Sequence, residues 1–394
     1  ALGRLINVEK SLAKNAEHRE LYHTTVQNLI KEKILVKFND QSTNTGYFVP
    51  TFNLFKLTRQ TSKCRQLYDY SSRCPSSKLT LNECIREPFD PMSSLVGILI
   101  KFRLGAHAVI ADISAFFHQI LRTENCQNYQ KVLYREHPSL TPTIYALVRI
   151  AFGARSSPSD SMVSVHILAD FFKELYKYGS KQLRESLYVD DYSDAAAIEK
   201  FLIRRFIEAR TILRVGSFPL VKVKTNSKQL FEKLTEAEKA KDAEKIFEFS
   251  HENEVVHKLL GVGLTQNLNY FMIDLKDINL KIEAIQKDSI ITKRRFSSIA
   301  ASLFAPDGVL QPFTIRAKHL LQAFWALELS WDTPLPEGEL YTKIRTYIEE
   351  IPVLSAFRVP RNIVIANEKE RRLVLFSDAA ESGVMAVAYL VSIQ

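Results

Sequence analysis

The sequence predicts an α+β fold in which helices pack on an antiparallel sheet, and three observations indicate it. In residues 187–192 an apolar, β-prone run ends in the adjacent carboxylates Asp190 and Asp191, and the chain resumes as a second β-prone run to residue 196. A separate strand-like run delivers Asp112. Segments whose apolar residues recur at helical spacing, such as 162–176, lie between these runs.

The stretch 187–196 predicts a tight hairpin with paired acids at its tip. Tyr188 and Val189 favour an extended backbone, whereas Asp favours turns. Two carboxylates held side by side repel unless a cation lies between them, and Mg²⁺ prefers a few oxygen ligands together with substrate phosphates. The hairpin is therefore a candidate metal site, and a solvated loop is its alternative.

Asp112 adds a third carboxylate, 78 residues before Asp190. If its strand lies beside the hairpin, one Asp from a strand end and two from a hairpin tip together hold two metal ions, as in a palm-type polymerase. Such ions lie about 4 Å apart and stabilise both the attacking and the leaving oxygen of an in-line displacement.

Composition limits the class of protein. With 394 residues, 46% of them hydrophobic, the chain is long enough for two or three globular domains. A formal net charge of +9 fits a polyanionic partner and also fits many ordinary basic proteins. The four cysteines lack CxxC spacing, which favours reduced thiols in an intracellular protein over a zinc site. No apolar run approaches the ~18 residues of a membrane span and no signal peptide opens the chain, so we expect a cytoplasmic protein without a membrane partner.

The N-terminal residues 1–60 are expected to be mainly helical and then loop-like, with Leu21 and Val26 in an approximate helical stripe. Residues 62–73 alternate basic and apolar side chains, which is typical of a strand with one wet face. Arg65 on this strand would grip a triphosphate, because a guanidinium matches phosphate oxygens. An isolated surface arginine on an edge strand is the alternative.

Two helices and a strand are expected around the acidic hairpin. After Pro158, apolar residues at helical spacing predict a helix that ends at Gly179. A second helix is expected over 198–215 and a strand over 218–226. Lys222 lies on that strand, where an exposed lysine needs no special role.

The next part of the chain is expected to begin with a solvated, charge-rich stretch over 228–256 that carries no visible chemistry. Strands over 258–262 and 270–273 predict a hairpin. The proline-rich residues 334–338 predict a linker, and a helix is expected over 341–348.

Residues 281–320 are basic, with seven Lys or Arg and three Asp or Glu, and their apolar spacing predicts two helices. Lys293, Arg294 and Arg295 would lie at the start of the first helix. The helix dipole gives cations nothing there, so a phosphate backbone suits these residues better.

Several of these stretches, taken in succession, resemble the reverse transcriptase of Bel/Pao long-terminal-repeat retrotransposons. Residues 188–191 match the reverse transcriptase signature of Tyr, any residue, Asp, Asp. The other stretches that carry the resemblance are 68–73, 81–83, 98–103, 111–113, 118–120, 130–135, 147–150, 152–158, 292–294, 308–310, 312, 315, 317–318 and 331–332. Phe152 stands where retroviral enzymes carry Gln, which the resemblance implies is a feature of this lineage.

The resemblance implies a right-hand polymerase with fingers, a palm and a helical thumb, followed by a connection and the start of an RNase H-like fold. It implies fingers and palm over 1–256, a primer-grip hairpin and basic helical thumb over 257–333, and a linker, connection and truncated RNase H-like start over 334–394. The implied activity is RNA-directed and DNA-directed DNA polymerisation, in which deoxynucleotides are added to a primer 3′ end during retrotransposon replication.

The resemblance also implies roles for individual residues. Asp112, Asp190 and Asp191 would be catalytic metal ligands, and with the Ile113 carbonyl they would hold two Mg²⁺ ions, or Mn²⁺ in their place. The residues implied to bind the deoxynucleoside triphosphate are Arg65, Phe117, Phe152, Gly153 and Lys222. Of these, Lys222 would offset charge near the leaving pyrophosphate. Those implied to bind template and primer are Tyr188, Leu260, Gly261, Lys293, Arg294 and Arg295. Phe117, five residues after Asp112, would exclude a 2′-hydroxyl, and core packing is its alternative.

A strand over 372–380 resembles the first strand of an RNase H domain and places Asp378 where that domain has its first metal-binding carboxylate. Met385 departs from the glycine usual in the second strand, which includes 386–389. A hydrolytic two-metal site needs several further carboxylates, for which the remaining residues leave no room. No RNase H activity is therefore expected from this chain.

Two alternatives remain at this point. One is a catalytically silent, nucleic-acid-binding remnant of a reverse transcriptase, against which the intact Asp112, Asp190 and Asp191 argue. The other is an RNA polymerase on the same palm, against which Phe117 argues. The expected partners are an RNA or DNA template with its primer and deoxynucleoside triphosphates, in the cytoplasm and in virus-like particles, and the sequence leaves the oligomeric state open.

Overall fold

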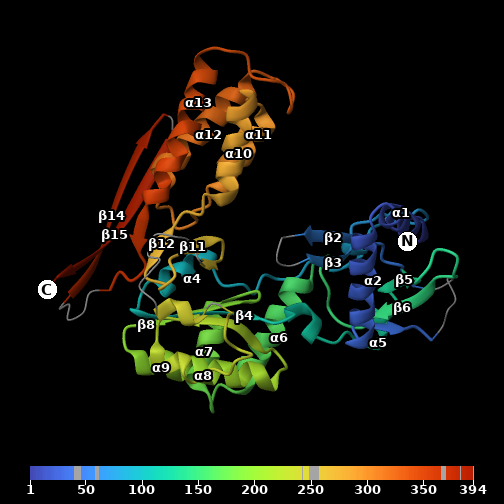
Figure 1. Cartoon of the computed structure of the whole chain (residues 1–394). Helices are drawn as coiled ribbons and strands as arrows, with labels where there is room; N and C mark the ends of the chain where they lie inside the picture. Colours follow the sequence, from blue (N-terminus) through green and yellow to red (C-terminus); the bar gives the residue numbers. More distant parts are fainter. Residues whose placement is uncertain are drawn as a thin grey trace. The chain divides into compact units, whose positions relative to one another are not determined.

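Helices and short antiparallel strands share the chain, so the structure, a computed structural model, has the predicted α+β class (Figure 1). It describes residues 1–39, 46–57, 62–241, 243–247, 257–364, 370–381 and 383–393. The chain divides into two compact units. Unit 1 comprises residues 1–92, 113–175 and 212–219, and unit 2 comprises residues 93–112, 176–211 and 220–394.

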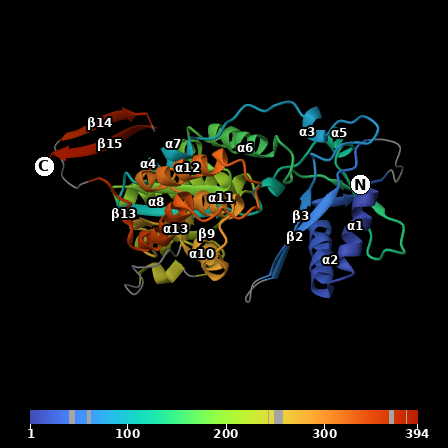
Figure 2. The same ribbon diagram turned by 90° about the horizontal axis from the view of Figure 1, so that it is seen from above.

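Unit 1 contains two small antiparallel sheets with helices beside them. Its elements are α1 (Leu2–Leu12), α2 (Ala16–Lys31), β1 (Leu35–Lys37), β2 (Thr51–Leu57), β3 (Ser62–Tyr68), α3 (Leu81–Cys84), η1 (Phe116–Gln119), α5 (Glu124–Gln127), β5 (Lys131–Tyr134), β6 (Thr143–Leu147) and α6 (Ser157–Phe171). The strands β2 and β3 form a hairpin, and a three-stranded sheet has the order β1-β6-β5. Helices α1 and α2 lie beside the β2–β3 hairpin (Figure 2).

The prediction for the N-terminal residues was partly wrong. Residues 2–31 are largely helical as expected, but the part expected to be loop-like contains β1 and β2. In α2 the buried residues are Tyr22 and Val26, whereas Leu21 is partly exposed, because the helix turns its Tyr22 side toward a core shared with Val132 and Leu147. The strand predicted over 62–73 is confirmed over Ser62–Tyr68, as β3, and it ends five residues earlier than expected.

The helix predicted between Pro158 and Gly179 was wrong in its extent. Helix α6 ends at Phe171, and a second helix, α7 (Lys177–Ser186), contains Gly179. A Cβ on Gly179 would lie 2.4 Å from the backbone nitrogen of Ala209. This glycine therefore permits the close approach of α7 to α8 (Glu199–Val215) rather than ending a helix.

The main sheet of unit 2 carries the acidic hairpin. Its strands are β7 (Leu187–Tyr188), β8 (Asp191–Ala196), β4 (His107–Ile113) and β9 (Leu220–Thr225), in the order β7-β8-β4-β9. One face packs on α8, where the buried ring of Tyr192 lies 5.9 Å from that of Phe206. On the other face Ala195 joins a cluster with Leu99 of α4 (Leu95–Phe102) and with Leu264. The predicted hairpin, the helix over 198–215 and the strand over 218–226 are thereby confirmed.

A second antiparallel sheet joins segments that are far apart in the chain. It consists of β10 (His257–Leu259), β11 (Val262–Leu264), β12 (Tyr270–Met272) and β13 (Arg358–Pro360), in that order. The stretch 258–262 was predicted as one strand, but a turn at Leu260 and Gly261 divides it into β10 and β11. A single strand was expected because the whole stretch is apolar apart from Lys258 and Gly261.

Arg361, directly after β13, ties this sheet to the segment that precedes β4. Its guanidinium is fully buried and donates four hydrogen bonds of 2.6 to 2.8 Å, to the carbonyl oxygens of Leu268, Phe102, Gly105 and Ala106. Burial lowers the pKa of Arg361 to about 10. The four acceptors compensate the burial of the charge.

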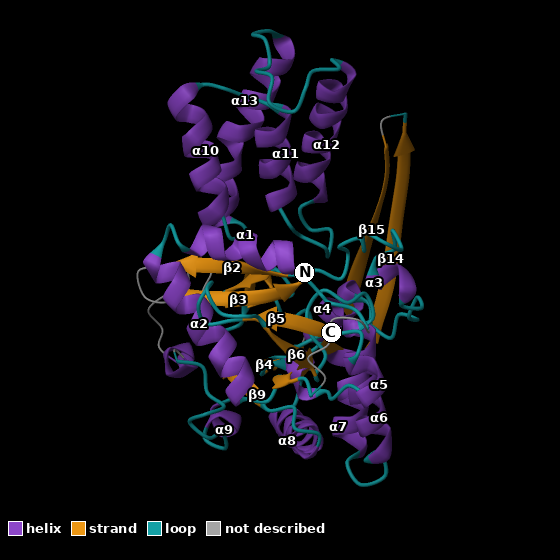
Figure 3. Cartoon of the chain, turned by 90° about the vertical axis from the view of Figure 1, so that its right-hand side faces the viewer, coloured by secondary structure: helices purple, strands orange, loops and turns teal. Residues whose placement is uncertain are grey.

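Four helices of unit 2 form a bundle, in which they lie side by side (Figures 1 and 3). They are α10 (Lys276–Asp288), α11 (Lys293–Ser302), α12 (Gln311–Ala326) and α13 (Glu339–Glu350), and η4 (Ile351–Ala356) follows. Their shared core includes Phe296, Phe324 and Ile344. Because Ile344 of α13 belongs to this core, the domain boundary predicted at residue 333 cuts through one bundle.

Two segments of unit 2 lie outside these sheets and the bundle. Within the stretch predicted to be solvated, the described elements are α9 (Lys228–Phe231) and η2 (Ala243–Phe247), while residues 248–256, with the domain boundary predicted at 256, lie outside the described residues. The C-terminal strands are confirmed as a hairpin of β14 (Glu370–Ala380) and β15 (Gly383–Ile393), and nearly all of their described side chains are exposed. In the described part of the chain, no helix has the length and apolar composition needed to cross a membrane.

Candidate active site

The three predicted catalytic carboxylates lie at one end of the main sheet. Asp112 is near the end of β4 and pairs in register with Asp191, the first residue of β8. Asp190 lies in the two-residue turn between β7 and β8. Side chains opposite each other on antiparallel strands have Cβ atoms about 4.5–5.5 Å apart. Strand pairing thus brings Asp112 beside the hairpin, as expected from the sequence.

The turn of the hairpin has a strained backbone. Val189 has a φ of +55°, a region that β-branched residues rarely adopt, although two-residue hairpin turns favour positive φ. Of the ten non-glycine residues with positive φ in the described part of the chain, three are predicted site residues or lie in the predicted acidic hairpin, namely Val189, Lys222 and Leu260. Such strain costs about 1–3 kcal/mol per residue and gathers at functional sites.

The charges at this end of the sheet influence one another. The pKa of Asp191 is raised to about 6, first by burial and then by the negative charges of Asp190 and Asp112, while Lys222 lowers it. The ammonium of Lys222 forms an ion pair with the carboxylate of Asp112. A site in which carboxylates raise the pKa of a neighbour in this way favours cations.

The donor set fits a hard divalent cation, because it consists of carboxylate oxygens whose mutual repulsion a cation relieves. Asp112, Asp190 and Asp191 would supply these oxygens. Ile113 follows Asp112, and since its apolar side chain is buried, only its main-chain carbonyl is a possible ligand. Among the described residues, no three His, Cys, Asp or Glu side chains are already gathered closely enough to hold an ion. The three carboxylates lie at the same end of the sheet, but they are not arranged as a complete set of metal ligands.

Three residues predicted to bind the nucleotide lie together in unit 1. The rings of Phe117 and Phe152 are 4.8 Å apart and edge to face, and the guanidinium carbon of Arg65 is 5.4 Å from the centre of the Phe152 ring. Phe116 is only 3% exposed, whereas Phe152 is 37% exposed and Phe117 is intermediate. Phe116 thus takes the core position, and this distribution favours a surface role for Phe117 over core packing.

Gly153 has a structural reason for its residue type. Its φ is +114°, and a Cβ at this position would lie 2.1 Å from the carbonyl oxygen of Tyr68. Its own carbonyl oxygen accepts a hydrogen bond from the side chain of Asn82. Backbone conformation and close packing therefore require glycine here, independently of any contact with a nucleotide.

The residues predicted to meet the primer lie at turns. Leu260 and Gly261 connect β10 to β11 with φ of +49° and +85°, and Gly261 is exposed. A Cβ on Gly261 would lie 2.9 Å from the ring of Phe304, so this turn packs against the segment that follows α11. Tyr188 ends β7, pairs with Asp191 and is partly exposed.

The structure corrects the expectation for Lys293. Its side chain is buried, and its ammonium donates a hydrogen bond of 2.6 Å to the carbonyl oxygen of Leu329, 5.2 Å from the centre of the Trp325 ring. The packing of α11 on α12 accounts for this position. Lys293 is therefore not available to a phosphate backbone.

Arg294 is exposed and Arg295 is partly exposed, but both are already paired. Arg294 forms two hydrogen bonds to the carboxylate of Asp332, and Arg295 forms two to that of Asp288. Cations at a helix N-terminus are repelled by the dipole, and these carboxylates offset that repulsion. Each arginine would have to exchange its carboxylate for a phosphate in order to bind nucleic acid.

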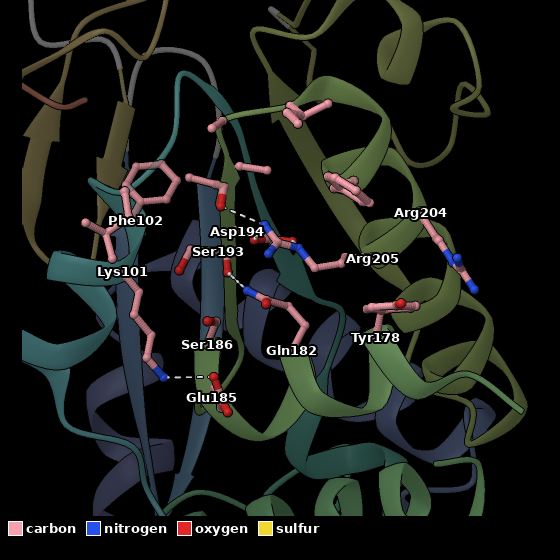
Figure 4. A pocket seen from close by; sticks show the side chains of 16 residues that line it. Lys101, Phe102, Tyr178, Gln182, Glu185, Ser186, Ser193, Asp194, Arg204 and Arg205 are labelled. Atoms are coloured by element: carbon pink, nitrogen blue, oxygen red, sulfur yellow. Dashed lines mark hydrogen bonds and ion pairs between the residues drawn. The ribbon is translucent and has the colours of Figure 1, made fainter. Parts of the chain in front are cut away.

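A cavity of about 480 Å³ in unit 2 contains none of the predicted site residues (Figure 4). On its wall Arg205 donates hydrogen bonds of 2.6 and 2.9 Å to the buried carboxylate of Asp194, and Gln182 donates to the carbonyl oxygen of Ser193. Burial raises the pKa of Asp194 to about 7, against the effect of Arg205. Asp194 lies on β8 three residues after Asp191, so this pair braces the strand that carries Asp191. No role was expected for this pair from the sequence, although an Asp within a β-prone run of small and aromatic residues was a signal for a partner.

Comparisons with known proteins agree with this architecture. A family model described as the Pao retrotransposon-like RNaseH-like domain matches residues 292–394. No curated protein matches the chain. A foamy viral protease-reverse transcriptase dRH in complex with double-stranded DNA has a TM-score of 0.59 at 14% identity, over 94% of this chain and 53% of that one. A foamy viral protease-reverse transcriptase in complex with an RNA/DNA hybrid has a TM-score of 0.57 at 16% identity, over 95% of this chain and 41% of that one.

These findings concern the fold and the lineage. A further foamy viral protease-reverse transcriptase structure, with double-stranded DNA, has a TM-score of 0.55 at 15% identity, over 94% of this chain and 63% of that one. This chain therefore spans only about half of the length of these proteins, and at such identities the likeness shows the shared fold. The family match runs from α11 to β15 and includes Asp378. Together the two findings confirm the predicted resemblance and support a Bel/Pao-type pol fragment.

Proposed function

We propose that the chain is an RNA-directed and DNA-directed DNA polymerase that adds deoxynucleotides to a primer 3′ end by two-metal phosphoryl transfer during retrotransposon replication. The observation that carries the proposal is the convergence of Asp112, Asp190 and Asp191 at one end of the main sheet. Two-metal nucleotidyl transfer requires carboxylates from neighbouring strands in this way. The effect of Asp190 and Asp112 on the pKa of Asp191 supports the same reading.

In this proposal the predicted parts of a right-hand polymerase correspond to segments of the chain. Fingers and palm lie within 1–256. The primer grip corresponds to the turn between β10 and β11, and the thumb corresponds to the bundle α10–α13. Because α13 belongs to this bundle, the thumb extends beyond the boundary predicted at residue 333. The connection and the RNase H-like start follow within 357–394.

Asp112, Asp190 and Asp191, with the carbonyl of Ile113, would hold the two cations. When bound, two Mg²⁺ ions, or Mn²⁺ in their place, would lower the pKa of the primer 3′-hydroxyl and neutralise charge on the triphosphate and the leaving pyrophosphate. Lys222 would provide a further positive charge near the phosphates.

Arg65, Phe117 and Phe152 would form one wall of the nucleotide site. The guanidinium of Arg65 matches phosphate oxygens, and its position over the Phe152 ring holds it in place. Phe117 would pack on the sugar and exclude a 2′-hydroxyl, and the edge-to-face contact with Phe152 would fix the orientation of its ring. Because Gly153 has no side chain, its backbone would be able to lie close to these three residues.

The proposed partners are an RNA or DNA template with its primer and deoxynucleoside triphosphates. The foamy viral proteins similar to this chain were solved with double-stranded DNA and with an RNA/DNA hybrid. Tyr188, Leu260 and Gly261 would lie along the primer, and Arg294 and Arg295 would meet phosphates after leaving their carboxylates. No RNase H activity is proposed for this chain, and degradation of the RNA strand of a hybrid would overturn that statement.

The test is primer extension on a poly(rA) template with an oligo(dT) primer and Mg²⁺, with the parent and Asp190→Asn measured side by side. We expect the variant to lose at least about 100-fold in extension rate, on the scale of other losses of transition-state stabilisation, while hybrid binding measured by fluorescence anisotropy changes little. Glu349→Gln is the matched control, because it removes one exposed carboxylate from α13 and should leave extension unchanged.

Other results of this experiment would refute the assignment or support a different function. An active Asp190→Asn enzyme would refute the assignment of the hairpin. Hybrid binding without extension by the parent would indicate a silent nucleic-acid-binding remnant. Ribonucleotides incorporated as readily as deoxynucleotides would indicate an RNA polymerase and would remove the proposed role of Phe117.

A further inference from the structure

Lys222 reaches the acidic end of the main sheet from β9, the strand next to β4. Its ammonium forms an ion pair with the carboxylate of Asp112, which is proposed above to hold a metal ion. The side chain of Lys222 is 70% exposed and that of Asp112 is 35% exposed. Because neither side chain is fully buried, the ammonium can leave this carboxylate without leaving a buried charge unpaired.

The backbone of β9 is distorted at Lys222 itself. In a regular strand alternate residues face the same side, but in β9 the buried residues are Leu220, Val223 and Thr225, so one extra residue is inserted between the first two. Lys222 has a φ of +53° at this insertion. These are the features of a β-bulge, which re-aims a side chain and is common beside active sites. The bulge turns Lys222 outward, and its ammonium meets Asp112.

An ordinary surface ion pair does not account for this arrangement. Exposed pairs between a lysine and a carboxylate stabilise a fold only weakly, whereas a non-glycine residue with positive φ destabilises it by more. The ion pair of Lys222 therefore does not stabilise the fold enough to offset the backbone strain at this residue. Strain of this kind persists where it serves a site.

We infer that Lys222 takes the place of a metal ion at Asp112 in the protein without nucleotide, and that it must be displaced before the carboxylates can hold both ions. This inference rests on the proposed function. An ammonium offsets part of the repulsion among Asp112, Asp190 and Asp191, but it carries half the charge of Mg²⁺ and cannot bring several carboxylates into one coordination sphere. Lys222 thus acts as a competitor within the chain that keeps metal affinity low.

The competition couples metal binding to nucleotide binding. Nucleotide phosphates add oxygen ligands for the metal and also offer Lys222 an alternative anion. The lysine then exchanges Asp112 for a phosphate oxygen, which places it where the sequence suggested a charge near the leaving pyrophosphate.

The experiment measures Mn²⁺ binding to the whole chain without nucleic acid, from the electron paramagnetic resonance signal of the free ion. Lys222→Gln should bind Mn²⁺ roughly three- to tenfold more tightly than the parent, because Asp112 is released and a positive charge is removed. Lys222→Arg keeps the charge and should bind like the parent. Lys224→Gln removes the same charge from the same strand, at a residue whose ammonium lies 2.7 Å from Nδ1 of His257, and should change the affinity less than twofold.

The outcomes separate this inference from the proposed function. Asp112→Asn tests the metal site itself and should weaken Mn²⁺ binding severalfold. If Asp112→Asn weakens binding while Lys222→Gln binds like the parent, the inference is wrong and the proposed metal site stands. If Asp112→Asn leaves binding unchanged, the proposed site is wrong. Equal gains in Mn²⁺ affinity in Lys222→Gln and Lys224→Gln would show that net charge alone accounts for the effect, and this result would also refute the inference. Lys222→Met, with circular dichroism spectra of every variant, provides a second uncharged replacement should the Gln variant fail to fold.

Discussion

Replacing Asp191 by Asn should stabilise the fold at neutral pH although, under the function proposed above, it would abolish nucleotide addition. The pKa of Asp191 is raised from 3.8 to about 6, which corresponds to about 3 kcal/mol of unfavourable free energy for the ionised carboxylate in the folded state. Since the side chain is only partly buried, solvent screening reduces this figure, and we expect the variant to gain about 1–2 kcal/mol in free energy of unfolding at pH 7.

The pH dependence of this gain identifies its cause. Between about pH 4 and pH 6 the folded state binds the proton of Asp191 more tightly than the unfolded state, so this residue makes the parent less stable as pH rises through that window. Asn cannot ionise and does not follow this trend. The difference in free energy of unfolding should therefore be full above about pH 6 and should vanish below about pH 4.

The assay is urea denaturation followed by far-UV circular dichroism at about pH 7 and about pH 4. Asp190→Asn is the matched control, because Asp190 is exposed and should give a smaller gain, although both variants lose primer extension. A variant Asp191→Asn that is no more stable than the parent at pH 7 would refute the reasoning. A gain of equal size at pH 4 would show that packing or hydrogen bonding, rather than charge, is responsible.

Two further predictions concern residues that hold the fold around the site. Arg361→Met should lower the free energy of unfolding by about 3–5 kcal/mol, because it leaves four carbonyl acceptors without their donor and three of these lie on buried residues. Arg345→Met on the exposed face of α13 should cost less than about 0.5 kcal/mol in the same urea titration. Gly153→Ala should destabilise unit 1 by roughly 2–4 kcal/mol, because its Cβ meets the Tyr68 carbonyl and its φ is positive. Gly338→Ala, where nothing lies within 4 Å of the added carbon, is the control, and equal resistance of the two alanine variants to limited proteolysis would contradict this reasoning.

Local pattern was sufficient to predict the acidic hairpin. Tyr188 and Val189 favour strand and Asp190 favours a turn, so a span of ten residues fixes β7, the turn and β8 without help from the rest of the chain. The helix α8 was predictable for a similar reason, because its apolar residues follow one period over four turns. The pairing of β4 with β8 is a contact between distant segments, and it was expected only through the resemblance of Asp112 and its neighbours to a known motif.

Local pattern failed where a distant segment decides what is buried. Lys293 looked like a free cation at a helix start, but a carbonyl oxygen and a tryptophan ring from the other end of α12 enclose it. Gly179 looked like a helix end, yet it lies inside α7 because α8 passes too close for a side chain. Arg361 gave no signal at all, since its four acceptors come from residues about 90 to 260 positions earlier.

The order of residues along the chain was enough to identify the carboxylates of the proposed site. The types and spacing of Asp112, Asp190 and Asp191 depend only on the order of residues, and the hairpin that presents two of them forms through local preferences. The tertiary structure alone decided the electrostatic state of these carboxylates. The pairing of β4, β8 and β9 brings three carboxylates together, raises the pKa of Asp191 and, through the bulge at Lys222, sets a lysine against Asp112. Charges interact according to their distance in space, and only the folded sheet fixes that distance.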